Sequence, residues 1–294
     1  MKAMSIKIRL FLYSMLFCFL GLFLVGVYSY FIARKSLLNR TFSQLTYVRE
    51  EKARLLENFF NDRTRESELA SQLIAKEGYV CSNTTGNPPQ NYKLPPSILQ
   101  DFTKKARCYT SISIGFPDGS IQCFKLNSNG TNDGIYISTQ ESVGLKELYQ
   151  KVVSTNKTAI KDFEFQSLFG ENSAYVASPI VGADSIIKGV TFLQVPEHVV
   201  NELMTEKNVG KGLGRTGEVY LVGSDYLMRS SSRFVENSSL KTQCKTQAIE
   251  MALKGNEGTM RMNDYRNVSV LSSYRPITIL DVQWVIAAEM DWNE

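Results

Sequence analysis

The chain has 294 residues, and its 33 Lys and Arg against 29 Asp and Glu give a formal net charge of +4. Much of this small basic excess flanks an apolar stretch near the N-terminus. No basic stripe is interleaved with aromatic residues, which excludes nucleic acid as a partner. With one histidine, His198, and no C-x-x-C pair, we expect no metal site. The sequence also lacks a G-x-S-x-G elbow and a convincing carboxylate pair, so we expect neither catalysis nor a cofactor.

Residues 10–33 contain no charged side chain and are rich in Leu, Phe and Val. As a helix they would extend about 36 Å, enough to cross a hydrocarbon core of about 30 Å. A cleaved signal peptide is the alternative, but its apolar region is shorter and ends at a small-x-small site, whereas this segment runs into Arg34 and Lys35. We therefore predict a transmembrane helix over 10–33.

The orientation of this helix cannot be read from charge, because basic residues flank both of its ends. The short leader and the large polar remainder favour a cytoplasmic N-terminus at residues 1–9, with residues 36–294 outside.

Residues 36–76 alternate apolar and charged positions with helical spacing, which predicts a long amphipathic helix. The helix can pack on its own domain, or it can form the heptad-like seam of a homodimer. We expect it to do both. The apolar positions are Leu38, Phe42, Leu45, Val48, Leu55, Leu56 and Phe59.

Beyond a turn-rich break at 82–97, the pattern predicts two α+β modules with antiparallel sheets and helices on their faces. We assign 77–200 to the first module and 201–294 to the second, smaller one. The first would hold helices over 97–105 and 143–154, a hairpin over 109–121, and strands over 159–165, 175–181 and 186–194. The second would hold strands over 218–222, 226–230, 258–262, 268–276 and 283–289.

The cysteines give a weak signal. Cys18 lies in the predicted membrane span, and Cys81, Cys108, Cys123 and Cys244 would face an oxidising compartment, where three complete pairings are open. The simplest register of the 109–121 hairpin places Cys123 opposite Ile112, so a bridge to Cys108 and isolated thiols both stay open.

Several segments resemble double Cache domains, the extracytoplasmic sensor modules of bacterial transmembrane receptors. The segments lie at 174–180, 189–194, 210–234, 271–277 and 284–291, and the resemblance covers roughly residues 100–294. It implies two PAS-like antiparallel subdomains on one long helix, the first distal to the membrane and the second proximal to it.

The glycines at 212–217 also spell G-x-G-x-x-G, the dinucleotide-binding fingerprint. That fingerprint needs a strand before the glycines and a helix after them. Here a helical segment (199–207) precedes and a strand (218–222) follows, so we interpret the glycines as a positive-φ turn.

The resemblance implies a small-molecule site in the distal half, between the sheet and a lid over 136–142. Ser111 and Ser113 alternate on one strand face, and Arg107 or Lys125 would hold a carboxylate. The predicted lining is Arg107, Tyr109, Ser111, Ser113, Lys125, Tyr136, Phe163, Tyr175 and Ser178. Arg229, Ser230, Arg233 and Tyr274 match positions typical of the proximal half, and we interpret them as structural.

Amino-acid-sensing members of the family use an aromatic-and-Arg cluster that includes Trp. Both tryptophans here, Trp284 and Trp292, lie in the proximal half, which favours an organic acid as the ligand.

The resemblance further implies a receptor in the bacterial inner membrane with a periplasmic sensor and a cytoplasmic output, such as a kinase, chemotaxis, cyclase or phosphatase module, absent from this chain. The alternative is a single-span type II membrane protein with an adhesion or interaction ectodomain. That reading would suit the six N-x-S/T sequons, at Asn39, Asn83, Asn129, Asn156, Asn237 and Asn267.

Overall fold

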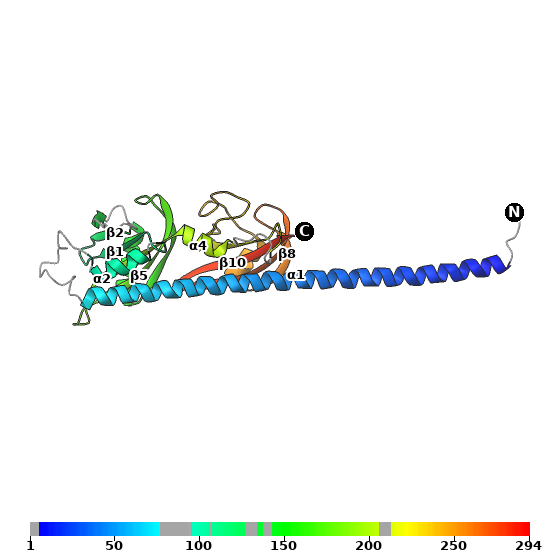
Figure 1. Cartoon of the computed structure of the whole chain (residues 1–294), viewed down its shortest axis with the longest axis horizontal. Helices are drawn as coiled ribbons and strands as arrows, with labels where there is room; N and C mark the ends of the chain where they lie inside the picture. Colours follow the sequence, from blue (N-terminus) through cyan, green and yellow to red (C-terminus); the bar gives the residue numbers. More distant parts are fainter. Residues whose placement is uncertain are drawn as a thin grey trace.

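The computed structural model describes residues 6–76, 94, 96–105, 107–126, 134–137, 143–205 and 213–294. Two antiparallel sheets lie one after the other along a single long helix, α1 (Figure 1). The helices are α1 (Ile6–Lys76), α2 (Pro96–Lys104), α3 (Val143–Thr155), α4 (Glu197–Met204) and α5 (Gln247–Leu253). The strands are β1 (Ser111–Gly115), β2 (Ile121–Lys125), β3 (Gly134–Ile137), β4 (Ala159–Gln166), β5 (Glu171–Val181), β6 (Ile187–Pro196), β7 (Glu218–Gly223), β8 (Gly258–Asn263), β9 (Ser269–Ile279) and β10 (Val282–Asp291).

Helix α1 joins the predicted membrane span and the predicted amphipathic helix without a break. No Gly or Pro occurs between 34 and 76, so nothing in the sequence interrupts the backbone hydrogen bonds. Among the described helices, α1 alone is long and apolar enough to cross a membrane: its most apolar 18-residue window has a mean hydropathy of 2.4 and no buried residue. This N-terminal part projects beyond both sheets (Figure 1).

The distal sheet has the strand order β3-β2-β1-β6-β5-β4. One of its faces packs on α1 and α2 through a core that includes Ile74, Phe102 and Ile112. The opposite face packs on α3 through a second core that includes Leu148 and Phe192. Because side chains alternate along a regular strand, these two cores assign the positions of β1, β2 and β6 to one face or the other.

The proximal sheet has the order β7-β10-β9-β8. The face toward α1 carries Trp284 and Ile286, which share one continuous core with Leu56 and Phe60 of α1 and with Phe163 of the distal half. The other face packs on α5 through Tyr220, Ile249 and Val285, among others. The two halves are therefore joined by buried apolar contacts as well as by α1.

Two local predictions were wrong. Residues 226–230 form isolated bridges, Val222 with Met228 and Leu227 with Gln243, because the segment pairs partly with β7 and partly with the 240–243 loop after a positive φ of 65° at Tyr226. The hairpin register is shifted by one residue, so that Cys123 lies opposite Ser113. The five-residue connection from Phe116 to Ser120 sets this register.

The cysteines at positions 18, 108, 123 and 244 are free thiols, and Cys81 lies outside the described residues. Strand β3 and helix α5 were not predicted.

Candidate ligand-binding site

A buried polar patch lies on the distal sheet, on the face away from α1. Ile112 and Ile114 of β1 point into the core shared with α1, so Ser111 and Ser113 point to the opposite face. Lys125 of β2 and Gln194 of β6 are the cross-strand partners of Ser111, and they lie on this same face.

Gln194 ties three strands together in this patch. Ser111 Oγ donates a hydrogen bond to Gln194 Oε1 at 2.6 Å, and Gln194 Nε2 donates to Ser173 Oγ at 3.0 Å. At most 1% of the surface of each of these three residues is exposed. The hydrogen bonds satisfy polar groups that would otherwise be costly to bury.

Tyr175 lies beside Gln194 on the neighbouring strand and is buried. Burial raises the pKa of its phenol far above the ordinary value, so the hydroxyl keeps its proton and remains a potential donor. Burial also raises the pKa of the Cys123 thiol. Hydrogen bonds with Ser113 and Ser111 lower this pKa but do not outweigh burial, so the cysteine is a neutral thiol.

Opposite charges border the patch at its Ser111 end. Lys125 is exposed, and its ammonium lies 5.8 Å from the centre of the Phe169 ring. The Glu171 carboxylate accepts a hydrogen bond from Thr110 Oγ1, next to Ser111 in the chain. The patch thus offers buried hydroxyls and an amide with a cation and a carboxylate at the rim.

The structure brings Ser111, Ser113, Lys125 and Tyr175 of the predicted lining together, and it adds Ser173, Gln194 and Glu171. The sequence carried one signal for the missed residues: Gln194 is the one polar residue in the apolar run 192–196 of β6, where a strand position is normally buried.

Tyr109, Phe163 and Ser178 of the predicted lining lie elsewhere. Tyr109 faces α1, where its hydroxyl donates to Glu66 and its ring lies 5.4 Å from that of Phe102. Phe163 lies at the junction of the two halves, with its ring 5.9 Å from that of Trp284.

Ser178 faces α1, because β5 turns Tyr175 and Ala177 to the α3 side. Arg107 is exposed in the turn before β1, and no described contact joins it to the patch. Tyr136 lies on β3 opposite Gln122, and the rest of the predicted lid, 138–142, lies outside the described residues.

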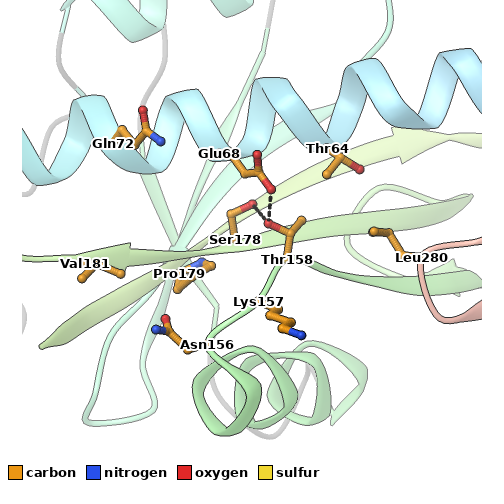
Figure 2. A pocket seen from close by; sticks show the side chains of 10 residues that line it. All are labelled: Thr64, Glu68, Gln72, Asn156, Lys157, Thr158, Ser178, Pro179, Val181 and Leu280. Atoms are coloured by element: carbon orange, nitrogen blue, oxygen red, sulfur yellow. Dashed lines mark hydrogen bonds between the residues drawn. The ribbon is translucent and has the colours of Figure 1, made fainter. Parts of the chain in front are cut away.

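Ser178 lines a groove of about 600 Å³ between α1, the start of β4 and the β9–β10 turn (Figure 2). Its hydroxyl and that of Thr158 are 2.9 Å apart, and Thr158 donates to Glu68 Oε1 of α1 at 2.9 Å. These contacts tie the distal sheet to α1.

The proximal residues singled out from the sequence all bind other parts of the protein. Arg229 pairs with Asp162 and Asp225, and Ser230 Oγ accepts from the Leu221 amide at 3.0 Å. The Arg233 guanidinium donates to the carbonyls of Gly217 and Arg215, and Tyr274 Oη lies 3.5 Å from Met251 Sδ. Such contacts support a structural role.

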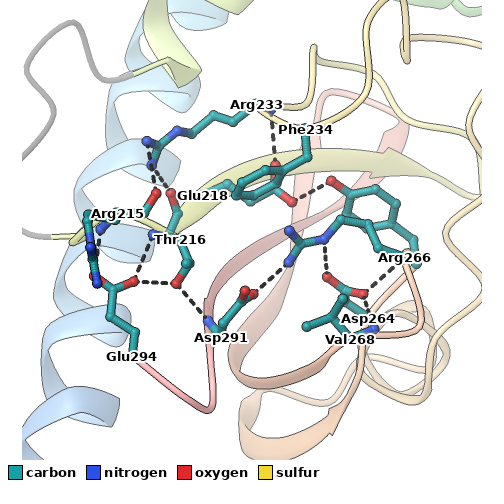
Figure 3. A network of polar contacts seen from close by, with 12 residues as sticks. Arg215, Thr216, Glu218, Arg233, Phe234, Asp264, Arg266, Val268, Asp291 and Glu294 are labelled. Carbon is teal, nitrogen blue, oxygen red and sulfur yellow. Dashed lines mark hydrogen bonds and ion pairs between the residues drawn. The ribbon is translucent and has the colours of Figure 1, made fainter.

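The glycine-rich turn holds a carboxylate of the chain itself (Figure 3). Gly214 has a φ of 62°, and the amides of Arg215 and Thr216 donate to the Glu294 carboxylate at 2.6 and 2.7 Å. Strand β7 follows the turn, whereas a dinucleotide-binding fingerprint needs a helix at this position. Gly212 lies outside the described residues.

No family model and no curated protein matches the chain. Solved structures do match. The periplasmic sensory domain of the Campylobacter jejuni chemoreceptor Tlp1 is 14% identical over 85% of this chain and 94% of that domain, with a TM-score of 0.62. The ligand-binding domain of Tlp3 from the same organism, in complex with L-valine, is 13% identical over 88% and 96%, with a TM-score of 0.61.

The ligand-binding domain of the Pseudomonas aeruginosa amino acid chemoreceptor PctC, in complex with GABA, is 15% identical over 85% of this chain and 100% of that domain, with a TM-score of 0.57. The same arrangement of two antiparallel sheets along one helix thus recurs across these domains. The chain therefore shares the fold of these sensory and ligand-binding domains, in agreement with its resemblance to double Cache domains.

Proposed function

We propose that this chain is the extracytoplasmic sensor region of a bacterial receptor and that it binds a small polar molecule at the distal patch. The observation that carries the proposal is the buried Ser111–Gln194–Ser173 hydrogen-bond chain, flanked by Tyr175 and Lys125. A small number of precisely placed polar groups on a largely apolar face is typical of small-molecule sites.

The ligand class follows from the rim charges. The Lys125 ammonium suits a carboxylate, and the polar groups behind it suit hydroxyl or amino groups. We therefore propose a small organic acid. The complexes of the similar Tlp3 and PctC domains with L-valine and GABA make an amino acid the second class to test.

Residues 10–33 of α1 would span the inner membrane, with residues 1–9 in the cytoplasm and residues 36–294 in the periplasm. The uncovered apolar surface of this part of α1 supports that placement. A homodimer through the exposed side of α1, and a cytoplasmic output module outside this chain, complete the proposal.

Signal transfer would use α1, because both sheets are bonded to it. In the proximal half, Arg49 Nη1 donates to the Tyr274 carbonyl at 2.7 Å. In the distal half, Ser71 Oγ donates to the Ser178 carbonyl at 3.2 Å. A ligand that favours one arrangement of the distal sheet would shift the population of α1 positions.

The test is ligand-induced stabilisation of the full chain in lipid nanodiscs, against panels of organic acids and amino acids. A ligand at 100 times its dissociation constant should stabilise the protein by about 2.7 kcal/mol. Lys125→Met should weaken binding of a carboxylate at least tenfold. Lys157→Met, which removes an ammonium from the groove beside α1, should leave this binding unchanged. If neither panel stabilises the protein, the interaction-ectodomain alternative gains support.

A further inference from the structure

Two glutamates lie directly opposite each other in the proximal sheet. Glu218 of β7 and Glu289 of β10 are cross-strand partners, with 2% and 1% of their surfaces exposed. Like charges directly opposite destabilise a strand pair, and a buried carboxylate without a cation is costly. One proton held by the pair would remove this cost.

The nearby cations are bonded to other groups, although the charge of Arg266 still favours the charged form of Glu218. Arg266 is engaged by Asp264 at 2.6 Å and by Asp291 at 2.8 Å (Figure 3). The Arg233 guanidinium donates to backbone carbonyls instead. Several titratable and charged groups face the two glutamates from the elements packed around them. They are Tyr220 of β7, Cys244 in the loop before α5, Asp264, Tyr265 and Arg266 of the β8–β9 turn, and Arg233.

Hydrogen bonds distinguish the two carboxyl groups. Glu218 accepts from Tyr265 Oη at 2.5 Å, from Ser232 Oγ at 3.1 Å and from the Arg233 amide at 3.2 Å, so three donors stabilise its charged form. Glu289 accepts from Ser272 Oγ at 2.9 Å through Oε1 only.

Glu289 Oε2 and the Tyr220 hydroxyl are both buried and close enough to interact, although they lie outside strict hydrogen-bond geometry. A hydrogen bond between them would satisfy both atoms in either state: a protonated Glu289 would donate to the Tyr220 oxygen, and a charged Glu289 would accept from the Tyr220 hydroxyl. The second arrangement lowers the pKa of Glu289 and works against the effect of burial. Burial raises the pKa of both carboxyl groups, that of Glu289 to about 8.

The strand end beyond Glu289 is held at three points. The Asp291 amide donates to Thr216 Oγ1 at 3.1 Å, and the Glu294 carboxylate sits in the 213–217 turn. The Trp292 ring lies 3.8 Å from the Arg261 guanidinium and 5.5 Å from that of Arg34, where α1 leaves the predicted membrane span. The pair is thus linked to the membrane end of α1.

We propose that Glu289 is a proton-binding site, and that loss of its proton next to Glu218 loosens the pairing of β7 with the end of β10. The membrane-proximal end of the sensor would then respond to alkaline pH, independently of the ligand proposed for the distal half.

The sign of the effect follows from the raised pKa. The stabilisation from this group is complete below the ordinary carboxyl pKa of 4.5 and declines as the pH rises toward about 8, with no further loss above that value.

The test is hydrogen exchange by mass spectrometry on the full chain in nanodiscs between pH 6 and 9, corrected for intrinsic exchange rates. Protection of peptides over 213–220 and 286–294 should fall tenfold or more across this range. Glu289→Gln should abolish this dependence. Glu218→Gln should move the transition to lower pH, because it removes the neighbouring negative charge, and the exposed Glu236→Gln should behave as wild type.

A Glu289→Gln protein that keeps the wild-type pH dependence would overturn the proposal. Should that variant fail to fold, infrared difference spectra of the wild-type protein supply a second reading. The proposal expects a protonated-carboxyl C=O band that is present at pH 6 and lost by pH 9.5, and an unchanged band contradicts it.

Discussion

Arg229 in the proximal half and Asp162 in the distal half form a bidentate ion pair across the junction of the two sheets. Arg229 Nε and Nη2 donate to the Asp162 carboxylate at 2.9–3.0 Å, and Trp284 Nε1 donates to the same carboxylate at 2.8 Å. The Arg229 side chain is only 4% exposed. One carboxylate of β4 thus anchors two side chains of the other half, beside the apolar core that both halves share with α1.

We predict that Asp162→Asn destabilises the protein by about 2–3 kcal/mol, because it leaves the buried Arg229 charge with Asp225 as its one remaining carboxylate partner. Asp225→Asn should cost less, since the Asp225 side chain is 48% exposed and better screened. Denaturant unfolding measures both. A double-mutant cycle of Arg229 with Asp162 should show a coupling above 1 kcal/mol, and additive losses would contradict the prediction.

The distal patch gives a second prediction. Gln194→Leu leaves the Ser111 and Ser173 hydroxyls buried without their hydrogen-bond partner, so stability should fall by about 1–3 kcal/mol. Gln150→Leu, an exposed change of the same kind on α3, serves as the control and should stay within about 0.5 kcal/mol of wild type. Equal midpoints for the two variants in thermal unfolding would argue against a satisfied buried network.

A third prediction concerns the glycine-rich turn. An alanine Cβ at Gly214 would lie 2.3 Å from Glu294 Oε1, and the φ of 62° there adds backbone strain. Gly255 also has a positive φ, of 88°, but nothing lies within 4 Å of its added Cβ. Gly214→Ala should therefore cost about 1 kcal/mol more than Gly255→Ala in unfolding free energy. In a Glu294→Ala background this difference should vanish.

Cysteine reactivity supplies a fourth prediction. Burial raises the pKa of the Cys123 and Cys244 thiols, so few thiolates form at neutral pH, and neither sulfur is open to reagent. Cys108 is half-buried. With iodoacetamide at pH 7.5, followed by peptide mass mapping, Cys108 should be alkylated well before the other two. Rapid labelling of Cys244 in the folded protein would refute the packing of the α5 core.

Local patterns predicted most of the elements. The uncharged run before Arg34, the helical spacing around Leu56 and the strand alternation near Ser111 and Trp284 each depend on neighbouring residues, and the helices and strands there agree with them. Where pairing partners are distant in sequence, prediction was weaker. Residues 227–229 divide their backbone hydrogen bonds between β7 and residues 240–242, which no periodicity reveals.

The sequence by itself determined a long apolar-to-amphipathic helix, two antiparallel modules and the absence of a strand-glycine-helix nucleotide motif, because these follow from hydrophobic period and turn chemistry. Tertiary structure alone decided that Ser111, Gln194 and Ser173 share one buried patch while Tyr109 and Phe163 lie elsewhere. It also decided that Asp162 meets Arg229 and that Glu218 meets Glu289. The physical reason is that strand register and face assignment bring together side chains up to tens of residues apart, and burial then fixes their charge and hydrogen bonding.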